Sequence, residues 1–438
     1  MPEGQRYGVL RESWRSSVLE VSQSPTSSPL TYALFCLIVL FNVGIPKAGV
    51  AFGETPMTFG YLAFLGFAAF GFIFVIKHSR ISFAATANFL FGFVPIGTLA
   101  VVKLLYGGSS YGLLLYTLIL LIIPAIMLLL YTPVLESLSE KEIAKPLVYC
   151  VRFTVAWGIM NFLIFAFTQR LIEIPYVTVH PLDVGEIYQK NNRRGILMKL
   201  VGTYNNGNLF GVCMLMLFPI YFYFEKSRLF LAAACMALLL TLSRTVWFGL
   251  AGLSALMVMM RLIRIGKPWI WLTGAALAAI GIALLPLMGW TPDRVVEARM
   301  GGRMVLWDQL VLTPIGAGDV KVKEVLYASL LQSFGIVGTL SAVIAFAFPV
   351  VYGLARLSEL SALRRSALCG IMTYLFVSFS DAAFIYPPTI VIFMFVVTML
   401  YRHGYANESD VPPPPAAQQR QPAPGSTISL AQASKLAG

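Results

Sequence analysis

Charged residues are scarce in this chain of 438 residues, where Asp, Glu, Lys and Arg together make up only 12%. Soluble proteins carry roughly twice that share. Hydrophobic residues make up 58% of the chain, and its mean hydropathy is +0.77. These values exclude an ordinary cytosolic enzyme, a disordered protein and a secreted disulfide scaffold. They favour one polytopic membrane domain over the two or three soluble domains that length alone would give.

Histidine and paired cysteine are also rare. The chain has three histidines and five cysteines, with no Cys-x-x-Cys pair and no His-Glu-x-x-His motif. A protein-ligated zinc site is therefore not expected. The cysteines all fall in apolar stretches, where we expect them to pack as small hydrophobic residues. They are Cys36, Cys150, Cys213, Cys235 and Cys369.

Long apolar runs make up most of the chain. A helix needs about 20 apolar residues to cross the hydrocarbon core of a bilayer. We identify twelve apolar segments, which predict an all-α, polytopic integral membrane protein with about twelve transmembrane helices. No short apolar run with a small-residue cleavage site precedes the first segment, so we expect an uncleaved anchor there. The segments cover residues 30–45, 58–76, 82–102, 111–131, 147–167, 209–224, 230–242, 245–260, 269–288, 326–352, 367–379 and 388–401.

The positions of Lys and Arg predict the orientation, because cytoplasmic loops next to spans carry an excess of both. We place the N-terminal segment 1–29, with its three arginines, in the cytoplasm, followed by a membrane domain at 30–401. Both termini are then cytoplasmic, and every inner loop is basic. The tail at 402–438 is rich in Pro, Ala and Gln and is expected to be disordered, a partner-binding motif being the alternative. The basic residues of the inner loops are Lys77, Arg80, Lys141, Lys145, Lys226, Arg228, Arg261, Arg264, Lys267, Arg356, Arg364 and Arg365.

Two predicted extracytoplasmic loops, 168–208 and 289–325, are also basic, although Lys and Arg are usually in excess on the cytoplasmic side. The net charge is +12, but nucleic acid is not an expected partner because most of the chain lies in lipid. The loops are either solvated basic surface or a site for an anionic group such as a pyrophosphate, which Arg binds bidentately. Their basic residues are Arg170, Lys190, Arg193, Arg194, Lys199, Arg294, Arg299, Arg303, Lys321 and Lys323.

Two local patterns lie beside apolar segments on the outer side. Residues 199–208 combine Lys199 with two glycines and three asparagines just before a predicted helix. The asparagines can cap that helix, or its free N–H groups can bind an anion. Arg244 stands between Ser243 and Thr245 in a tight hairpin between two apolar segments. Charge at a membrane boundary is costly and usually functional, although a snorkelling arginine at the interface is the alternative.

A third pattern begins at Arg303 and Trp307, which share one helix face at a spacing of four. Trp307 fits an interface anchor better than a catalytic group. A Pro-x-Gly-x-Gly turn at 314–318 breaks the helix, and a Gly-x-x-Gly pattern at 335–338 follows in the next span.

Taken in order, these patterns resemble the O-antigen ligase/polymerase superfamily of bacterial envelope glycosyltransferases. The order is basic-x-x-Gly-Thr-x-x-x-x-Asn, Ser-Arg-x-x-Trp, Arg-x-x-x-Trp, Pro-x-Gly-x-Gly and Gly-x-x-Gly, from about residue 199 to 338. The resemblance implies a multi-pass enzyme of the bacterial inner membrane that acts on its periplasmic face without metal, nucleotide or other cofactor. Its donor would be an undecaprenyl-diphosphate-linked oligosaccharide. Membrane lipid, a chain-length regulator and export proteins are further expected partners.

Some positions differ from the family pattern. Lys199 stands where members often have Arg, and residues 206–208 read Asn-Gly-Asn where Asn-Pro-Asn is usual. Glu324, eleven residues before Gly335, stands where ligases usually carry His. The loop at 289–325 is also short compared with that of many ligases. The last two features favour a polymerase of exopolysaccharide or O-antigen repeat units over the ligase that transfers glycan to lipid A core.

The resemblance assigns roles to six residues. We expect Arg244, Lys199, Arg303 and, more weakly, Arg194 to bind the diphosphate, because preorganised cations stabilise a leaving anion. Glu324 is the expected catalytic base and Asp319 the alternative, since a carboxylate can take the proton of an acceptor hydroxyl. An ion pair of Glu324 with Lys321 or Lys323 is the structural alternative.

Two other hypotheses remain. A transporter of lipid-linked oligosaccharide would show two similar halves with interrupted spans and ionisable groups in mid-membrane. No obvious repeat is present, and only Arg152 and Asp381 come close to such a position. A structural membrane partner in an export assembly would not need Arg244.

Overall fold

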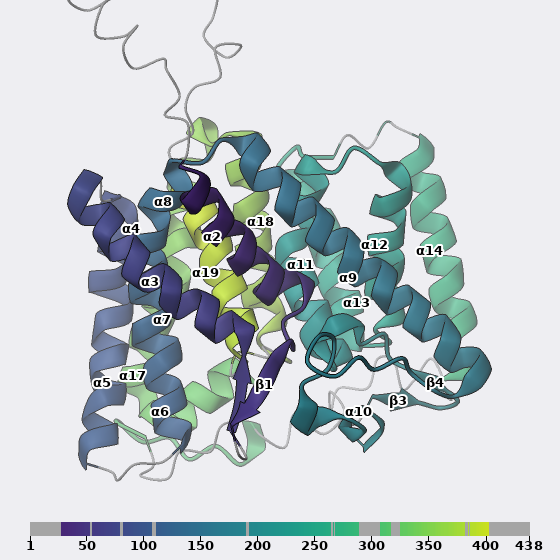
Figure 1. Cartoon of the computed structure of the whole chain (residues 1–438), viewed down its shortest axis with the longest axis horizontal. Coiled ribbons are helices and arrows are strands. Elements are labelled where there is room, and N and C mark those ends of the chain that lie inside the picture. The colour runs from purple at the N-terminus through teal and green to yellow at the C-terminus, as the bar shows by residue number, and fades with distance from the viewer. Residues whose placement is uncertain are drawn as a thin grey trace, which may run out of the picture. The chain divides into compact units, whose positions relative to one another are not determined.

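In the part of the chain that the structure describes, the protein is all-α apart from two short antiparallel hairpins, and most of its helices run side by side between two opposite ends (Figure 1). The computed structural model describes residues 28–52, 55–78, 82–106, 111–189, 192–263, 266, 268–288, 307–316, 325–381, 384 and 386–402. The predicted segments 1–29 and 402–438 lie almost entirely outside these residues.

The helices are α2 Pro29–Val39, α3 Phe59–His78, α4 Phe83–Ala87, α5 Val94–Tyr106, α6 Tyr111–Thr117, α7 Ile123–Ala125, α8 Thr132–Glu136, α9 Glu140–Thr168, α10 Glu186–Gln189, α11 Gly207–Phe224, α12 Arg228–Leu240, α13 Arg244–Met259, α14 Pro268–Leu287, α17 Leu326–Ala355, α18 Ala362–Val377 and α19 Pro387–Tyr401. The strands are β1 Gly49–Phe52, β2 Thr55–Thr58, β3 Arg193–Arg194 and β4 Leu197–Met198. Short π-helical turns at Leu40–Gly44, Asn88–Phe93, Leu118–Ile122 and Ile126–Tyr131 continue or join neighbouring α-helices.

Each of the twelve predicted apolar segments is helical, with ends that differ by a few residues. The largest difference is at α9, which begins at Glu140 rather than at residue 147. Ser139 and Glu142 cap its first turn reciprocally, each side chain bonding the backbone N–H of the other. Lys141 and Lys145, expected in a loop, therefore lie in the first turns of this helix.

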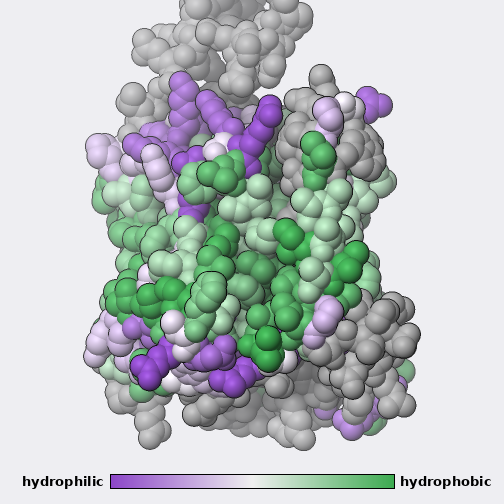
Figure 2. Space-filling model, turned by 90° about the vertical axis from the view of Figure 1, so that its right-hand side faces the viewer, coloured by the Kyte–Doolittle hydropathy of each residue, from purple (hydrophilic) through white to green (hydrophobic). Residues whose placement is uncertain are grey.

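Among the residues that the structure describes, six helical segments are long and apolar enough to cross a membrane, which indicates a multi-pass membrane protein. Figure 2 shows the corresponding surface, a hydrophobic band between two hydrophilic zones. Shorter apolar helices accompany these six, among them α12, α13 and α19. The six segments are Phe59–Lys77, Phe83–Tyr106, Gly112–Glu136, Glu140–Thr168, Gly207–Phe224 and Leu326–Ala355.

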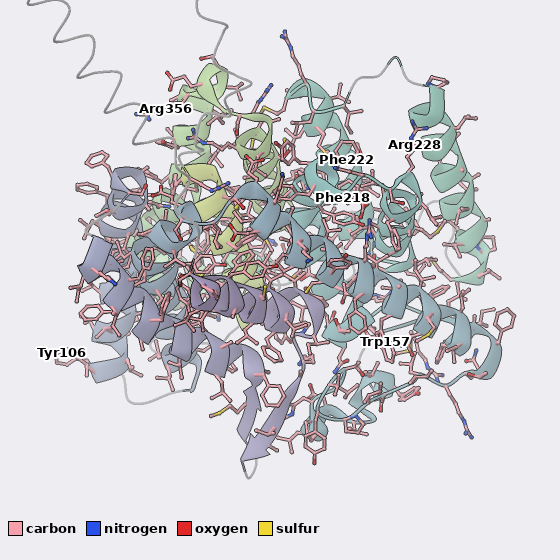
Figure 3. All side chains as sticks on the ribbon, turned by 45° about the horizontal axis from the view of Figure 1, so that its top comes forward. Tyr106, Trp157, Phe218, Phe222, Arg228 and Arg356 are labelled. Carbon is pink, nitrogen blue, oxygen red and sulfur yellow. The ribbon has the colours of Figure 1, made fainter. Side chains whose placement is uncertain are left out.

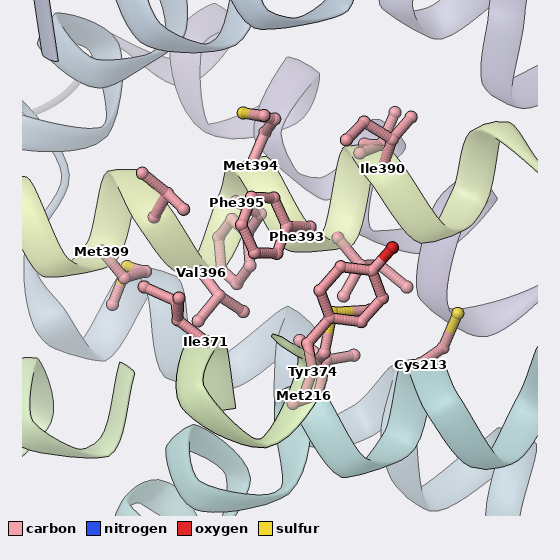
Figure 4. Packing of buried hydrophobic residues seen from close by; sticks show 14 of the residues in the cluster. Cys213, Met216, Ile371, Tyr374, Ile390, Phe393, Met394, Phe395, Val396 and Met399 are labelled. Carbon is pink, nitrogen blue, oxygen red and sulfur yellow. The ribbon is translucent and has the colours of Figure 1, made fainter. Parts of the chain in front are cut away.

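The core of the bundle lies around α11, which packs against α18 and α19 (Figure 4). In the most apolar stretch of α11, 78% of the residues are buried, against 22% for α3 at the periphery. Cys213 and Cys369 are buried free thiols in this core, as expected for small hydrophobic residues. Helix α11, which begins within the pattern at residues 199–208, is therefore the most buried of the six segments.

Hydrogen bonds between chain segments mark the two ends of the bundle. At one end, Arg364 Nε donates to the carbonyl of Leu400 at 2.8 Å, and Arg365 Nη1 donates to that of Met260 at 3.2 Å. Arg228 and Arg356 lie at this end as well (Figure 3). At the opposite end, the β1–β2 hairpin meets residues 176–183. Four basic residues of the predicted inner loops thus share one end, namely Arg228, Arg356, Arg364 and Arg365.

Helix α17 is broken at Gly335, where φ is 65° and ψ is −164°. Residues 313–316 dock into the break. The N–H groups of Ile336 and Val337 donate to the carbonyls of Thr313 and Pro314 at 3.0 and 3.1 Å. The Pro-x-Gly turn and the closing Gly-x-x-Gly pattern, predicted only as separate features, therefore contact each other.

Candidate functional site

The segment 168–208 forms a small folded layer at the end opposite to Arg364 (Figure 1). Lys47 pairs with Asp183 at 3.0 Å, and the ring of His180 hydrogen-bonds the carbonyl of Val50 at 3.0 Å. Leu197 of the β3–β4 hairpin packs with Leu242. These contacts attach the predicted outer loop to the bundle beside the α12–α13 connection.

Lys199 follows β4 and is buried, with only 5% of its surface exposed. Its backbone is held from both sides, because its own N–H donates to Asn192 and the next N–H, of Leu200, donates to Leu240, both at 2.8 Å. Its side chain passes close to Gly207, where an added Cβ would come within 2.7 Å of the Lys199 Cβ. Glycine at position 207 therefore leaves room for the lysine to run alongside the start of α11.

A chain of side-chain hydrogen bonds extends from Lys199 to a buried carboxylate. Lys199 Nζ donates to Asn208 Oδ1 at 3.1 Å, and Asn208 Nδ2 donates to Asp381 Oδ2 at 2.6 Å. Asp381 follows α18 and is only 2% exposed. We call Lys199, Asn208 and Asp381 the buried relay. It connects β4, the start of α11 and the connection between α18 and α19.

Arg244 is the first residue of α13, directly after the tight connection that follows α12. The hydroxyl groups of Thr245 and Ser380 are hydrogen-bonded at 2.7 Å, so the start of α13 is attached to the residue before Asp381. Trp247 Nε1 donates to the carbonyl of Leu239 at 2.8 Å and closes the hairpin. Arg244 and Lys199, two of the four predicted diphosphate-binding residues, therefore belong to neighbouring elements that meet at Ser380 and Asp381.

The start of α11 is capped by a side chain. Asn206 Oδ1 accepts the N–H groups of Asn208 and Leu209 at 2.9 and 3.2 Å, and the Asn206 carbonyl accepts that of Phe210. The capping interpretation of the asparagines is therefore confirmed. Asn206 therefore occupies three N–H groups at this end of the helix.

Of the other four predicted residues, only Arg194 is among those that the structure describes. Arg194 is in β3, where its Nη1 donates to the carbonyl of Arg193 at 3.0 Å, and the adjacent Gly195 lies against the end of α14. Arg303, Glu324 and Asp319 lie outside the described residues. Their roles as a diphosphate ligand, the base and the alternative base remain predictions from the sequence.

Sequence reasoning did not give Asp381 a role in this cluster. It is separated from Asn208 by 173 positions, and it was noted only as an ionisable residue near the membrane. The signal that was available is the pair Ser380–Asp381, which interrupts two apolar helices as Ser243–Arg244 does.

The other residue considered for a mid-membrane charge, Arg152, lies toward the opposite end. Its guanidinium binds Glu225 with both Nε and Nη2, at 2.7 and 2.6 Å, and it stacks on the ring of Phe230. Glu225 also accepts from Tyr221 at 2.8 Å and directly follows α11. This bidentate pair joins α9 to the end of α11.

The arrangement offers two cationic side chains, a buried carboxylate and several hydroxyl and amide groups at one end of the bundle. Such a group can bind an anion and hold a hydroxyl-bearing ligand beside it. Among the described residues, no group of three His, Cys, Asp or Glu is placed to hold a metal ion. No protein-family model matches the chain, and no curated protein matches it.

Proposed function

We propose that this protein is a periplasm-facing glycosyltransferase that polymerises lipid-linked repeat units of an exopolysaccharide or O-antigen and releases undecaprenyl diphosphate. The observation that carries the proposal is the meeting of Lys199 and the Arg244 hairpin at Ser380 and Asp381. The family resemblance selects these two basic residues, which are 45 positions apart. Side-chain contacts of Asn208 and of Thr245, next to Arg244, connect their elements to Asp381 and Ser380.

The proposed topology has about twelve spans, both termini in the cytoplasm and the site on the periplasmic face of the bacterial inner membrane. It is supported by the gathering of Arg228, Arg356, Arg364 and Arg365 at the end opposite to the site. Positive residues are retained on the cytoplasmic side.

In the proposed reaction, the oxygen of an acceptor sugar hydroxyl forms a new bond to the anomeric carbon of the donor glycan. The bond from that carbon to the diphosphate oxygen breaks, and its electron pair leaves with the diphosphate. Arg244 and Lys199, with Arg303 and Arg194, would stabilise that developing charge. The hydroxyl proton passes to a carboxylate, which we assign to Glu324 with Asp319 as the alternative. The resemblance implies inversion at the anomeric carbon.

A transporter of lipid-linked oligosaccharide has less support. Arg152 is engaged by Glu225 at the end of α11, and Asp381 lies in a connection after α18. Neither residue provides the mid-membrane ionisable group that a transporter of this kind would use.

The proposal is tested by reconstituting the purified protein into proteoliposomes with a purified lipid-linked repeat unit and with lipid A core as a competing acceptor. We expect polymer, with one undecaprenyl diphosphate released for each new linkage. Transfer of the glycan only to lipid A core would establish the ligase instead. Movement of the intact lipid-linked unit across the bilayer without a new linkage would establish the transporter.

Glu324→Gln tests the assigned base in the same assay. The amide keeps the shape of the side chain but does not accept the proton, so polymer formation should fall by about 10²–10⁴-fold. A rate within about threefold of the parent, far above that expectation, would remove Glu324 as the base and direct attention to Asp319.

A further inference from the structure

The buried relay places a cation and a carboxylate on the two sides of one amide. Lys199 is 5% exposed and Asp381 is 2% exposed, so both charges are largely removed from water. Burying charged groups costs free energy unless hydrogen bonds and opposite charges compensate. A well-packed apolar pair would usually serve stability at least as well. The presence of this arrangement next to the start of α13, where Thr245 is hydrogen-bonded to Ser380, therefore points to a role in the site rather than in folding.

The chemistry of the three side chains fixes the orientation of Asn208. An ammonium only donates hydrogen bonds and an ionised carboxylate only accepts them. Asn208 satisfies both neighbours only when its Oδ1 faces Lys199 Nζ and its Nδ2 faces Asp381 Oδ2, as the two distances of 3.1 and 2.6 Å describe. Without the carboxylate, the amide loses the hydrogen bond that anchors its NH₂ group, and only the lysine itself then orients the side chain.

We infer that Asp381 is a positioning residue of the diphosphate site: through Asn208 it fixes the ammonium of Lys199 in the place where that group binds the lipid diphosphate. This inference rests on the proposed function. It deepens that function by naming a residue that acts on the substrate anion through another side chain.

The inference makes a prediction opposite to that of simple electrostatics. If Asp381 acted only as a nearby negative charge, its removal would strengthen the binding of an anion. If it positions Lys199, its removal weakens binding, because the lysine loses its fixed geometry. The sign of the change in affinity therefore separates the two roles.

The experiment measures the binding of undecaprenyl diphosphate to the purified full-length protein in detergent by calorimetry. We expect Asp381→Asn, which keeps a neutral acceptor, to bind about threefold to tenfold more weakly. Asp381→Leu should bind about 10–100-fold more weakly. Asn208→Ala removes the connection while leaving both charges, and it should reproduce the loss seen with Asp381→Leu. Asp183→Asn, a carboxylate paired with Lys47 in the same outer layer, is the matched control and should bind as the parent does.

A double variant tests whether the effect passes through Lys199. Lys199→Met combined with Asp381→Asn should bind no more weakly than Lys199→Met alone, since coupled residues are not additive.

Thermal unfolding of each variant in detergent shows whether it is folded, and Asn208→Ala provides the test if the Asp381 variants are not. Equal or tighter binding by folded Asp381→Asn, or additive losses in the double variant, would overturn the inference. If the parent binds diphosphate and Lys199→Met weakens it while Asp381→Asn does not, the proposed function stands and the positioning role alone fails. If the parent does not bind undecaprenyl diphosphate, both fail.

Discussion

At the scale of single residues, buried charges at the two ends of this protein are held in different ways. Arg152 and Glu225 form a direct bidentate pair, whereas hydrogen bonds join Lys199 to Asp381 through Asn208. A direct pair with two parallel hydrogen bonds gives strength and fixed geometry. The Arg152–Glu225 pair is suited to joining two helices. The relay from Lys199 to Asp381 is suited to holding a cation for the ligand that we propose.

The Arg152–Glu225 pair predicts a stability that depends on pH. Hydrogen bonds from Arg152 hold the pKa of Glu225 at about 2, below the value of about 4.3 for an unperturbed Glu. Because the folded-state pKa is depressed, the stabilisation is complete above about pH 4.3 and declines as the pH falls toward 2. The melting temperature of the parent in detergent should therefore drop over that interval.

Glu225→Gln tests the same pair at neutral pH. It should reduce the free energy of unfolding by about 2–3 kcal/mol, less than the ~3–5 kcal/mol typical of a broken buried pair, because the Arg152 side chain is 30% exposed. The melting temperature of the variant should also depend less on acid than that of the parent. Glu359→Gln, at an exposed carboxylate near the same end, is the control. Equal melting temperatures for the two variants would show that the pair does not stabilise the fold.

Some of the individual site residues can be predicted from the sequence, and others cannot. Both predicted residues rest on local signals: Arg244 is a charge between two apolar segments, and Lys199 begins the Gly- and Asn-rich pattern just before another. Asp381 joins them only through the packing of α18 against α11 and α13, which no local pattern describes. The roles of Arg303, Asp319 and Glu324 still rest on the sequence alone.

At the scale of elements, apolar length predicted the helices well because burial in lipid or in the core decides where they form. The strands were not predicted. Those of the β3–β4 hairpin have two residues each, too few for a period-two pattern. The start of α9 was placed too late because the capping box at Ser139 and Glu142 draws polar residues into the helix. Short polar motifs such as this capping box therefore set helix ends that the apolar pattern alone does not locate.

The break in α17 gives a prediction at this scale. Gly335 has a φ of 65°, and an added Cβ would lie 2.6 Å from the N atom of Ile315. Gly335→Ala should therefore lower the free energy of unfolding by about 1–3 kcal/mol or more, through backbone strain and the loss of the docked turn. The measurement is thermal or denaturant unfolding in detergent.

Gly274→Ala is the matched control, because this glycine lies within α14 with no atom close to an added Cβ. It should leave stability unchanged or raise it by up to about 1 kcal/mol, since alanine favours helix. If Gly335→Ala is as stable as Gly274→Ala, the docking of residues 313–316 does not need glycine at the break.

At the scale of the whole molecule, the two ends of the bundle should face opposite sides of the membrane. A cysteine introduced at Asp183, in the folded layer 168–208, should react with a membrane-impermeant thiol reagent in intact spheroplasts. A cysteine at Glu142, in the first turn of α9, should be protected until the membrane is opened. Labelling of the parent chain measures the background from its five native cysteines, of which three are buried and two half-buried. The reverse labelling pattern would invert the topology and place the site in the cytoplasm.

The most direct test of the account is polymer formation by Arg244→Ala in the reconstituted system with purified lipid-linked repeat unit. Arg244→Lys is the conservative variant, and Arg356→Ala, an exposed arginine at the opposite end, is the control. We predict no polymer from Arg244→Ala, partial activity from Arg244→Lys, which keeps the charge but not the planar fork, and parental activity from Arg356→Ala. Normal polymer from folded Arg244→Ala would contradict the assignment of this cluster as the diphosphate site.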